Sequence, residues 1–312
     1  CELMEMPAVV WPAMFMGYSI IAMIILIIHR SRRSKETIAP QWFLLGALLW
    51  FPVLFLIAWD GLEINPSRGT VQSVLSMWYG QNLIWLWLTP VALAAAYYVI
   101  PAILGRAIDK YYLAIFGFWC IAGLAPWSVV HHLEGGPVPM WIPAIGTVMS
   151  IAMIFPIAVA STNFHSTAFQ DIGKVWNSLP LRFVIFGTLS YTISSYIGVV
   201  FSLPPVAKIT QFSIINEFHF NQRVYGFFSM IIFGLVYVYF PFMLFPLAQG
   251  IAMVPDDTRQ AAYDLGASRW QVLWQIEVPL AAPGIVVGSL LSFVLAAGAL
   301  AESKILGGQA VI

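Results

Sequence analysis

Two adjacent histidines, His131 and His132, stand in the segment VVHHLEGGPVP at the end of a long apolar run. Imidazole is a common ligand of haem iron, and it also binds copper and non-haem iron. A histidine pair at the edge of a membrane span has a simpler alternative role, as a hydrated pair at the lipid–water interface. Neighbouring residues of a regular helix point about 100° apart. Both histidines therefore reach one metal only if the helix end is irregular, and LEGGPVP favours such an end.

The elements that must position these histidines are membrane helices. The chain is 60% hydrophobic and 9% charged, with a mean hydropathy of +0.85, whereas about 25% of a soluble domain is charged. The formal net charge is zero, so the chain lacks the excess of basic residues that nucleic-acid binding requires.

The two cysteines, Cys1 and Cys120, form no disulfide framework. Cys1 stands where an initiator methionine is expected, and we interpret it as a fragment end rather than a processed lipoprotein cysteine.

The apolar stretches predict an all-α, polytopic membrane bundle in the lipid bilayer. A span needs about 20 mainly apolar residues, and lipid offers the backbone no hydrogen-bond partners, so the spans must be helices. The predicted spans are 7–28, 43–59, 80–100, 112–131, 140–161, 182–203, 224–248 and 284–300.

The loop 29–42, HRSRRSKETIAPQW, fixes the expected orientation. Its arginines and lysine place it in the cytoplasm by the positive-inside rule, which puts the N-terminus outside. Alternation of the spans then places the polar segment 249–283 in the cytoplasm. It also places the histidine pair at the outer side, together with Gln81 and His219. Polar groups at one membrane depth are functional candidates because they are costly there.

The order and spacing of four segments between about residues 12 and 232 carry a family resemblance. They are MWYGQNLIWLWLTPVALAAAYYVIPAILGRAIDKYYLAIFGFW, VVHHLEGGPVPMWIPAIGTVMSIAMIFPIAVA, LRFVIFGTLSYTISS and ITQFSIINEFHFNQRVYGFFSMIIFG. This part resembles subunit I of the haem–copper oxidases, in particular the C-type cytochrome c oxidases and the nitric oxide reductases. The resemblance implies a respiratory-chain subunit that works with other oxidase subunits. It also implies a high-spin haem beside a copper or iron with three histidine ligands, and a second, low-spin haem.

Transferred residue by residue, the resemblance makes His219 the proximal ligand of the high-spin haem, expected to be haem b. His131 and His132 match two ligands of the second metal. The third ligand, a histidine in the family's W-Y-G-H-N, is Gln81 here. An amide oxygen is a harder and weaker ligand than imidazole, so this set suits iron better than copper. His165, in STNFHSTAF, is expected to be a solvated loop residue away from the site.

At other positions of the family pattern, the functional residue is replaced in this sequence. Asn221 stands where the low-spin haem expects a histidine, and the span 43–59 has no histidine to supply the other ligand. The family's active-site tyrosine aligns with Ala125. We therefore expect an oxidoreductase-like protein without four-electron oxygen reduction. Nitric oxide reduction needs fewer groups but still needs electrons, and the alternative is haem binding without turnover.

A second pattern lies in the polar segment TRQAAYDLGASRWQVLWQIEVP, residues 258–279. Asp256, Asp257 and Thr258 follow Pro255 and are typical caps of a helix start. Gly266 interrupts the apolar spacing and permits a tight bend. We expect two short helices along the membrane surface, which either pack into a partner's groove or form an amphipathic interfacial pair.

The spacing of this segment resembles the coupling loop of ABC-importer permeases, especially those for polyamines. The matching positions are Gln260, Ala261, Ala262, Gly266, Ile276 and Pro279. Gln260 replaces the family's glutamate, and Val278 replaces a leucine. The resemblance covers about residues 235–305 and implies that 255–279 docks on an ABC ATPase subunit. The chain has no Walker A motif, so ATP hydrolysis is assigned to that partner.

The two resemblances predict two parts that join within 229–241. Residues 1–232 form a truncated oxidase-like bundle, and 233–312 form a permease-like segment with its cytoplasmic loop at 249–283. The first hypothesis is an oxidase-like subunit with a degraded metal site. The alternatives are an ABC permease subunit and a chimeric membrane protein with neither activity. All three place the chain in the bacterial inner membrane as a multi-pass protein.

Overall fold

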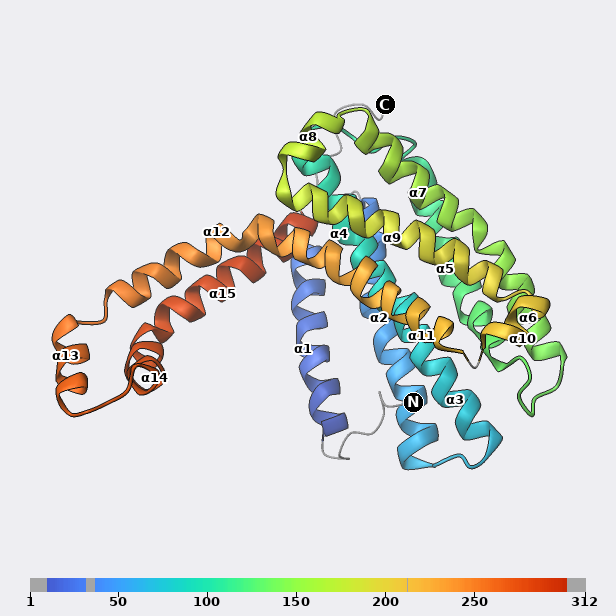
Figure 1. Cartoon of the computed structure of the whole chain (residues 1–312), viewed down its shortest axis with the longest axis horizontal. Coiled ribbons are helices and arrows are strands. Elements are labelled where there is room, and N and C mark those ends of the chain that lie inside the picture. The colour runs from blue at the N-terminus through green and yellow to red at the C-terminus, as the bar shows by residue number, and fades with distance from the viewer. Residues whose placement is uncertain (1–9, 32–36, 212, 302–312) are drawn as a thin grey trace. The chain divides into compact units, whose positions relative to one another are not determined.

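The computed structural model describes residues 10–31, 37–211 and 213–301, and every regular element in these ranges is helical (Figure 1). In chain order the α-helices are α1 (Val10–Ser31), α2 (Ala39–Trp59), α3 (Thr70–Asn82), α4 (Thr89–Leu104), α5 (Tyr112–Ser128), α6 (Trp141–Ala152), α7 (Ile154–Phe169), α8 (Ile172–Asn177), α9 (Leu179–Phe201), α10 (Pro204–Thr210), α11 (Ile214–Asn221), α12 (Met230–Ala252), α13 (Asp256–Asp264), α14 (Arg269–Val272) and α15 (Val278–Ala301). Wider π-helical turns extend several of them, at η2 (Asp60–Ile64), η3 (Leu83–Leu88), η5 (Gln222–Ser229) and η6 (Leu273–Glu277), and a tighter 3₁₀ turn forms η4 (Val129–Leu133).

Eight helical stretches in the described ranges are long and apolar enough to cross a membrane, which confirms the predicted all-α multi-pass bundle. They are Val10–Ser31, Ala39–Ile64, Thr70–Leu104, Tyr112–Leu133, Trp141–Phe169, Leu179–Phe201, Ile214–Pro241 and Arg269–Leu290. Several begin or end well outside the predicted limits, because a helix continues through polar residues that a count of apolar residues leaves out. The side of the membrane on which the N-terminus lies stays a prediction, and Cys1 lies outside the described residues.

The described chain divides into two compact units, residues 10–234 and 235–301. The centre of the first unit is the stretch Thr70–Leu104, of whose apolar window 78% is buried, against 6% for Val10–Ser31. Helix α4 is rich in alanine and contacts α2, α7 and α9. Small side chains let membrane helices approach closely, which explains this central position.

His165 was predicted in a solvated loop, and that prediction is wrong. The residue lies inside α7, is partly buried, and its ring contacts Phe169 with 6.3 Å between the ring centroids. Helix α7 continues to Phe169 because its later turns, although polar, bury Asn163 and Thr167 inside the first unit. The Asn163 amide donates a hydrogen bond to the hydroxyl of Tyr97 at 3.2 Å.

The second unit contains the two predicted short helices, α13 and α14, between α12 and α15 (Figure 1). Gly266 has φ +82, so the predicted bend at this glycine is confirmed. The predicted side-chain caps are wrong: Pro255 is the N-cap residue, and Asp256 and Asp257 lie in the first turn without capping it. Their charges still favour a helix N-terminus through the helix dipole.

Polar contacts of Ser268 and Arg259 hold α13 and α14 in the second unit. Ser268 caps α14 by accepting from the Gln271 backbone N–H at 3.4 Å, while its own N–H donates to the Gln271 side chain at 2.8 Å. Arg259 of α13 forms ion pairs with Asp256 at 2.6 Å and with Glu277 at 2.8 Å. The second pair ties α13 to η6, so the two arms of the bend are joined by more than the backbone.

Helices α12 and α15 approach each other at glycines. A Cβ atom on Gly284 would lie 2.5 Å from the Pro246 carbonyl oxygen, and one on Gly250 would lie 3.0 Å from the Ala281 carbonyl oxygen. Both distances are shorter than van der Waals contact, and the one at Gly284 leaves no room for a Cβ atom.

Gly284→Val is therefore expected to separate the two helices and to destabilise the second unit, because the valine side chain meets backbone that cannot move alone. Overpacking of this kind costs about 1–3 kcal/mol. Limited proteolysis between α12 and α13 measures the effect, with Gly123→Val as the control, since nothing lies within 4 Å of a Cβ at Gly123. Equal cleavage rates for the two variants would show that the glycine contact does not hold the unit together.

Candidate functional site

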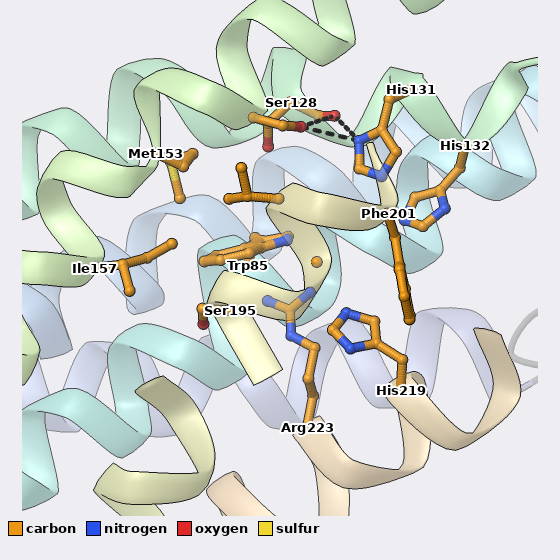
Figure 2. Close-up of a pocket in the computed structure, with 13 residues that line it drawn as sticks. Trp85, Ser128, His131, His132, Met153, Ile157, Ser195, Phe201, His219 and Arg223 are labelled. Carbon is orange, nitrogen blue, oxygen red and sulfur yellow. Dashed lines mark hydrogen bonds between the residues drawn. The ribbon is translucent and has the colours of Figure 1, made fainter. Parts of the chain in front are cut away.

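Three histidines from two distant parts of the chain line one buried chamber (Figure 2). His131 and His132 belong to η4, and His219 belongs to α11. The ring centroids of the adjacent pair are 4.2 Å apart, with 34° between the ring planes. The chamber has a volume of about 30 Å³. The structure thus brings together three imidazoles that are up to 88 positions apart in the sequence.

The predicted irregularity at the histidine pair is present in the structure. Helix α5 ends at Ser128, and the chain continues as the 3₁₀ turn η4 before Gly135, with φ +78, redirects it. Pro126 contributes because it lacks the N–H that a regular helix would use. The carbonyl of Pro126 accepts a hydrogen bond from the indole of Trp78 at 3.2 Å, which ties this end to α3.

The hydrogen bonds of His131 determine which ring nitrogen carries the proton. Its Nδ1 lies 2.6 Å from the Ser128 carbonyl oxygen and 3.0 Å from the Ser150 hydroxyl. A carbonyl oxygen only accepts, so Nδ1 is the donor and Nε2 keeps its lone pair. A neutral imidazole fixed in this way is the form that binds a metal.

Gly146 of α6 allows the helix to approach the histidine pair. A Cβ atom at this position would lie 2.2 Å from the backbone nitrogen of His131. The contact is therefore between two backbones, and it brings Ser150, one turn further along α6, within reach of the His131 ring. The backbone of His132 is fixed from another side, because its carbonyl accepts a hydrogen bond from the Gln211 amide.

His219 is 7% exposed, and its ring packs edge-on against Phe201 with 5.5 Å between centroids. Gly198 of α9 leaves room for this ring: a Cβ atom there would lie 3.1 Å from the His219 Nε2. The Nδ1 atom of His219 is buried and has no hydrogen-bond partner within the described part of the chain. An unpartnered, buried nitrogen of this kind is free to meet a bound group.

Arg223 lies in the same chamber and was not predicted as a site residue. Its guanidinium carbon is 3.9 Å from the centroid of the Trp85 ring, a cation–π contact. The sequence did contain a signal, because Arg223 is four positions after His219 and such residues share a helix face. The chamber's position and the contact with Trp85 could not be seen in the sequence.

A second, larger pocket adjoins the chamber and shares three lining residues with it: His132, His219 and Arg223. Its volume is about 1030 Å³. Gln81 lines this pocket and not the small chamber. Among the described residues no group of three or more His, Cys, Asp or Glu side chains is arranged to hold a metal. The structure places the two histidines side by side in the chamber, whereas Gln81 lines the neighbouring pocket.

The structure also shows where the remaining residues named by the two family resemblances lie. Ala125 is fully buried in α5, and Asn221 is exposed at the end of α11. In the second unit, Gln260, Ala261 and Ala262 belong to α13, Gly266 follows it, Ile276 belongs to η6 and Pro279 to α15. Large apolar side chains project around this bend, with Leu265 89%, Trp270 70% and Trp274 64% exposed.

A bundle of apolar helices that gathers histidines from separate spans into a buried chamber defines a multi-pass membrane protein with a candidate cofactor site. The chain belongs to the family "Cytochrome C and Quinol oxidase polypeptide I", which it matches over residues 1–294.

Curated relatives support both predicted resemblances. The chain is 24% identical over 214 residues to the "Cbb3-type cytochrome c oxidase subunit CcoN1" of Stutzerimonas stutzeri, which covers 66% of this chain and 45% of the relative. It is 26% identical over 218 residues to the "Cytochrome c oxidase subunit 1 homolog, bacteroid" of Bradyrhizobium diazoefficiens, covering 67% and 40%. The chain thus spans less than half the length of these oxidase relatives.

A further relative is a transporter subunit. The chain is 44% identical over 80 residues to the "Spermidine/putrescine transport system permease protein PotB" of Salmonella typhimurium, which covers 26% of this chain and 28% of the relative. The sequence therefore carries a long, distant match to the oxidases and a short, closer match to a permease.

Gly146→Ala is expected to displace the histidine pair, because the added methyl group collides with backbone and not with a flexible side chain. The expected loss of stability is about 1–3 kcal/mol, measured as a lower Tm of the purified protein in detergent. Gly123→Ala in α5 is the control, since it adds the same methyl group in open space. A Gly146→Ala protein that melts with the control would contradict the close backbone contact.

Proposed function

We propose that this protein is a bacterial inner-membrane subunit that binds one b-type haem through His219, beside a second metal position at His131, His132 and Gln81. The observation that carries the proposal is the chamber itself, in which imidazoles from α11 and η4 meet. Polar side chains in membrane spans are costly and mark function. Membership of the oxidase family supports haem as the group that they serve.

The residues around His219 fit a haem. The buried Nδ1 of His219 lacks a partner among the described residues, and the adjoining pocket of about 1030 Å³ is lined by the same histidine. Pockets for sizeable ligands span about 300–1,000 Å³, so the volume admits a macrocycle, although the lining is mostly polar and its large apolar side chains are Met77 and Phe220. When bound, haem supplies one-electron chemistry and a binding position for small gas molecules. His219 would hold and orient it, and the contact with Phe201 limits rotation of the His219 ring.

The residues at the second position fit a three-imidazole copper site poorly. Two histidines are present, and the residue at the third position, Gln81, has an amide side chain and lines the larger pocket. A carbonyl-type oxygen suits iron better than copper. We therefore assign this position to a weakly held iron.

The proposed activity is gas binding or slow reductive chemistry, such as nitric oxide reduction, and not four-electron oxygen reduction. Ala125 replaces the tyrosine that would supply an electron and a proton, and Asn221 cannot act as the imidazole ligand of a low-spin haem. Electrons would have to come from other oxidase subunits, which are the proposed partners. This proposal concerns only the part of the oxidase relatives that the chain matches, which is 45% and 40% of their length.

An absorption spectrum, dithionite-reduced minus air-oxidised, tests the haem proposal. The wild type is expected to show a Soret band that His219→Ala loses, because the axial ligand is removed. His165→Ala is the matched control, since this histidine also lies on a helix of the first unit, is partly buried and lines neither pocket. A folded wild type without haem, or a His219→Ala protein with a full Soret band, would refute the assignment.

A second candidate function is supported by a specific observation in the other unit. The bend between α13 and α14 lies at Gly266, as the coupling-loop spacing requires, and exposed apolar side chains surround it. We propose as the alternative that residues 255–279 dock on the ATPase subunit of an ABC importer. This alternative divides the chain into an oxidase-like part, 1–232, and a permease-like part, 233–312. The third alternative is a chimeric membrane protein with neither activity.

Gly266→Val tests the docking proposal, because a β-branched residue at positive φ strains the bend. Reduced capture of a polyamine-importer ATPase in a pull-down is the expected result. The matched control is Gly105→Val, which introduces the same strain at φ +68 outside this loop. Equal capture by both variants, or none by the wild type, would argue against docking.

A further inference from the structure

The histidine chamber contains a buried positive charge without a counter-ion. Arg223 is 6% exposed and lines the chamber. The side chains that line it include no aspartate or glutamate. The ion pairs found among the described residues involve Lys174 and Arg259, and none involves Arg223. Arginine stays protonated in proteins, so the chamber carries at least one uncompensated positive charge.

Donor groups in this chamber also lack acceptors. The Nη2 atom of Arg223 and the Oγ atom of Ser195 are both buried without a hydrogen-bond partner within the described ranges. Ser195, on α9, is 2% exposed and lines the same chamber (Figure 2). Buried polar groups are nearly always hydrogen-bonded, so two orphaned donors in one cavity indicate an absent acceptor.

The contact with Trp85 does not replace that acceptor. The guanidinium carbon lies 3.9 Å from the centroid of the indole ring, and this ring carries no net negative charge. A cation–π contact offsets part of the cost of burying the charge but supplies no negatively charged acceptor atom. A group with negative charge and at least one acceptor atom completes the site.

We propose that the chamber binds a small monovalent anion, such as nitrite, through Arg223 and Ser195. The volume of about 30 Å³ sets the size. A single water needs roughly 10–15 Å³ on the same measure, so there is room for about two or three non-hydrogen atoms. Arginine recognises planar oxyanions with paired N–H groups. The inference goes beyond the proposed haem function and does not require that a haem be bound.

Calorimetric titration of the purified protein with sodium nitrite, in a chloride-free buffer, tests the proposal. The wild type is expected to bind, and Arg223→Gln to raise the Kd at least about tenfold, because a charged donor is lost. Arg223→Lys keeps the charge and is expected to lose less affinity. Arg182→Gln is the matched control, since Arg182 is exposed and lies outside the chamber.

A second pair of variants keeps the test decisive if Arg223→Gln fails to fold. Ser195→Ala removes an orphaned donor and is expected to raise the Kd by roughly fivefold. Ser194→Ala is its control, because the hydroxyl of Ser194 bonds to the Tyr191 carbonyl at 3.3 Å and does not line the chamber. Circular dichroism of every variant establishes that it is folded.

The results separate this inference from the haem proposal. A haem-containing wild type that does not bind nitrite, or variants at Arg223 and Ser195 that bind as the wild type does, would overturn the anion site alone. Nitrite binding by a haem-free protein would support the anion site and count against the haem. Binding of sulfate or glutamate as tightly as nitrite would overturn the assigned size. A nitrite-dependent Soret shift unchanged in Arg223→Gln would place the anion on the haem instead.

Discussion

The histidine chamber depends on one close contact between backbones, at Gly146. Helix α6 comes so near to η4 that no side chain fits between them, and this approach brings the Ser150 hydroxyl to the Nδ1 of His131. The same region holds the Ser128 carbonyl that fixes the tautomer of that ring. A wider helix spacing would leave the imidazole free to rotate, and the chamber would lose its defined donors and acceptors.

Irregular helix geometry sets the remaining walls of the chamber. The π-helical segment η3 follows Gln81 and carries Trp85, and η5 follows His219 and carries Arg223. Widened turns of this kind often occur at functional sites because they change the direction of the side chains that follow. Here they carry an aromatic ring and a guanidinium that line the same chamber as the three imidazoles, while α9 supplies the small residues Ser195 and Gly198.

The sequence predicted those features that depend on composition and local spacing. The spans followed from the scarcity of charge, the irregular helix end at the histidines from the segment LEGGPVP, and the bend at Gly266 from its position between two short polar helices. Boundaries were missed where helices continue through polar residues, as at His165. Arg223, Trp85 and Ser195 were missed because their meeting depends on the packing of three separate spans.

The placement of Gln81 in a different cavity from His131 also could not be predicted, because a family alignment gives positions and not the space between them. The loss of the predicted caps at Asp256 and Asp257 has a related cause. Several consecutive residues had side chains that can cap a helix. Which of them becomes the N-cap depends on the backbone angles at Pro255, and the residue types do not determine these angles.

The shared wall between the two cavities has a kinetic consequence. The residues that line both spaces, His132, His219 and Arg223, contribute side chains that rotate about their own bonds. We therefore expect passage between the larger pocket and the chamber to depend on rotamer changes of these three side chains. The more tightly these side chains are held, the longer a small ligand would stay in the chamber.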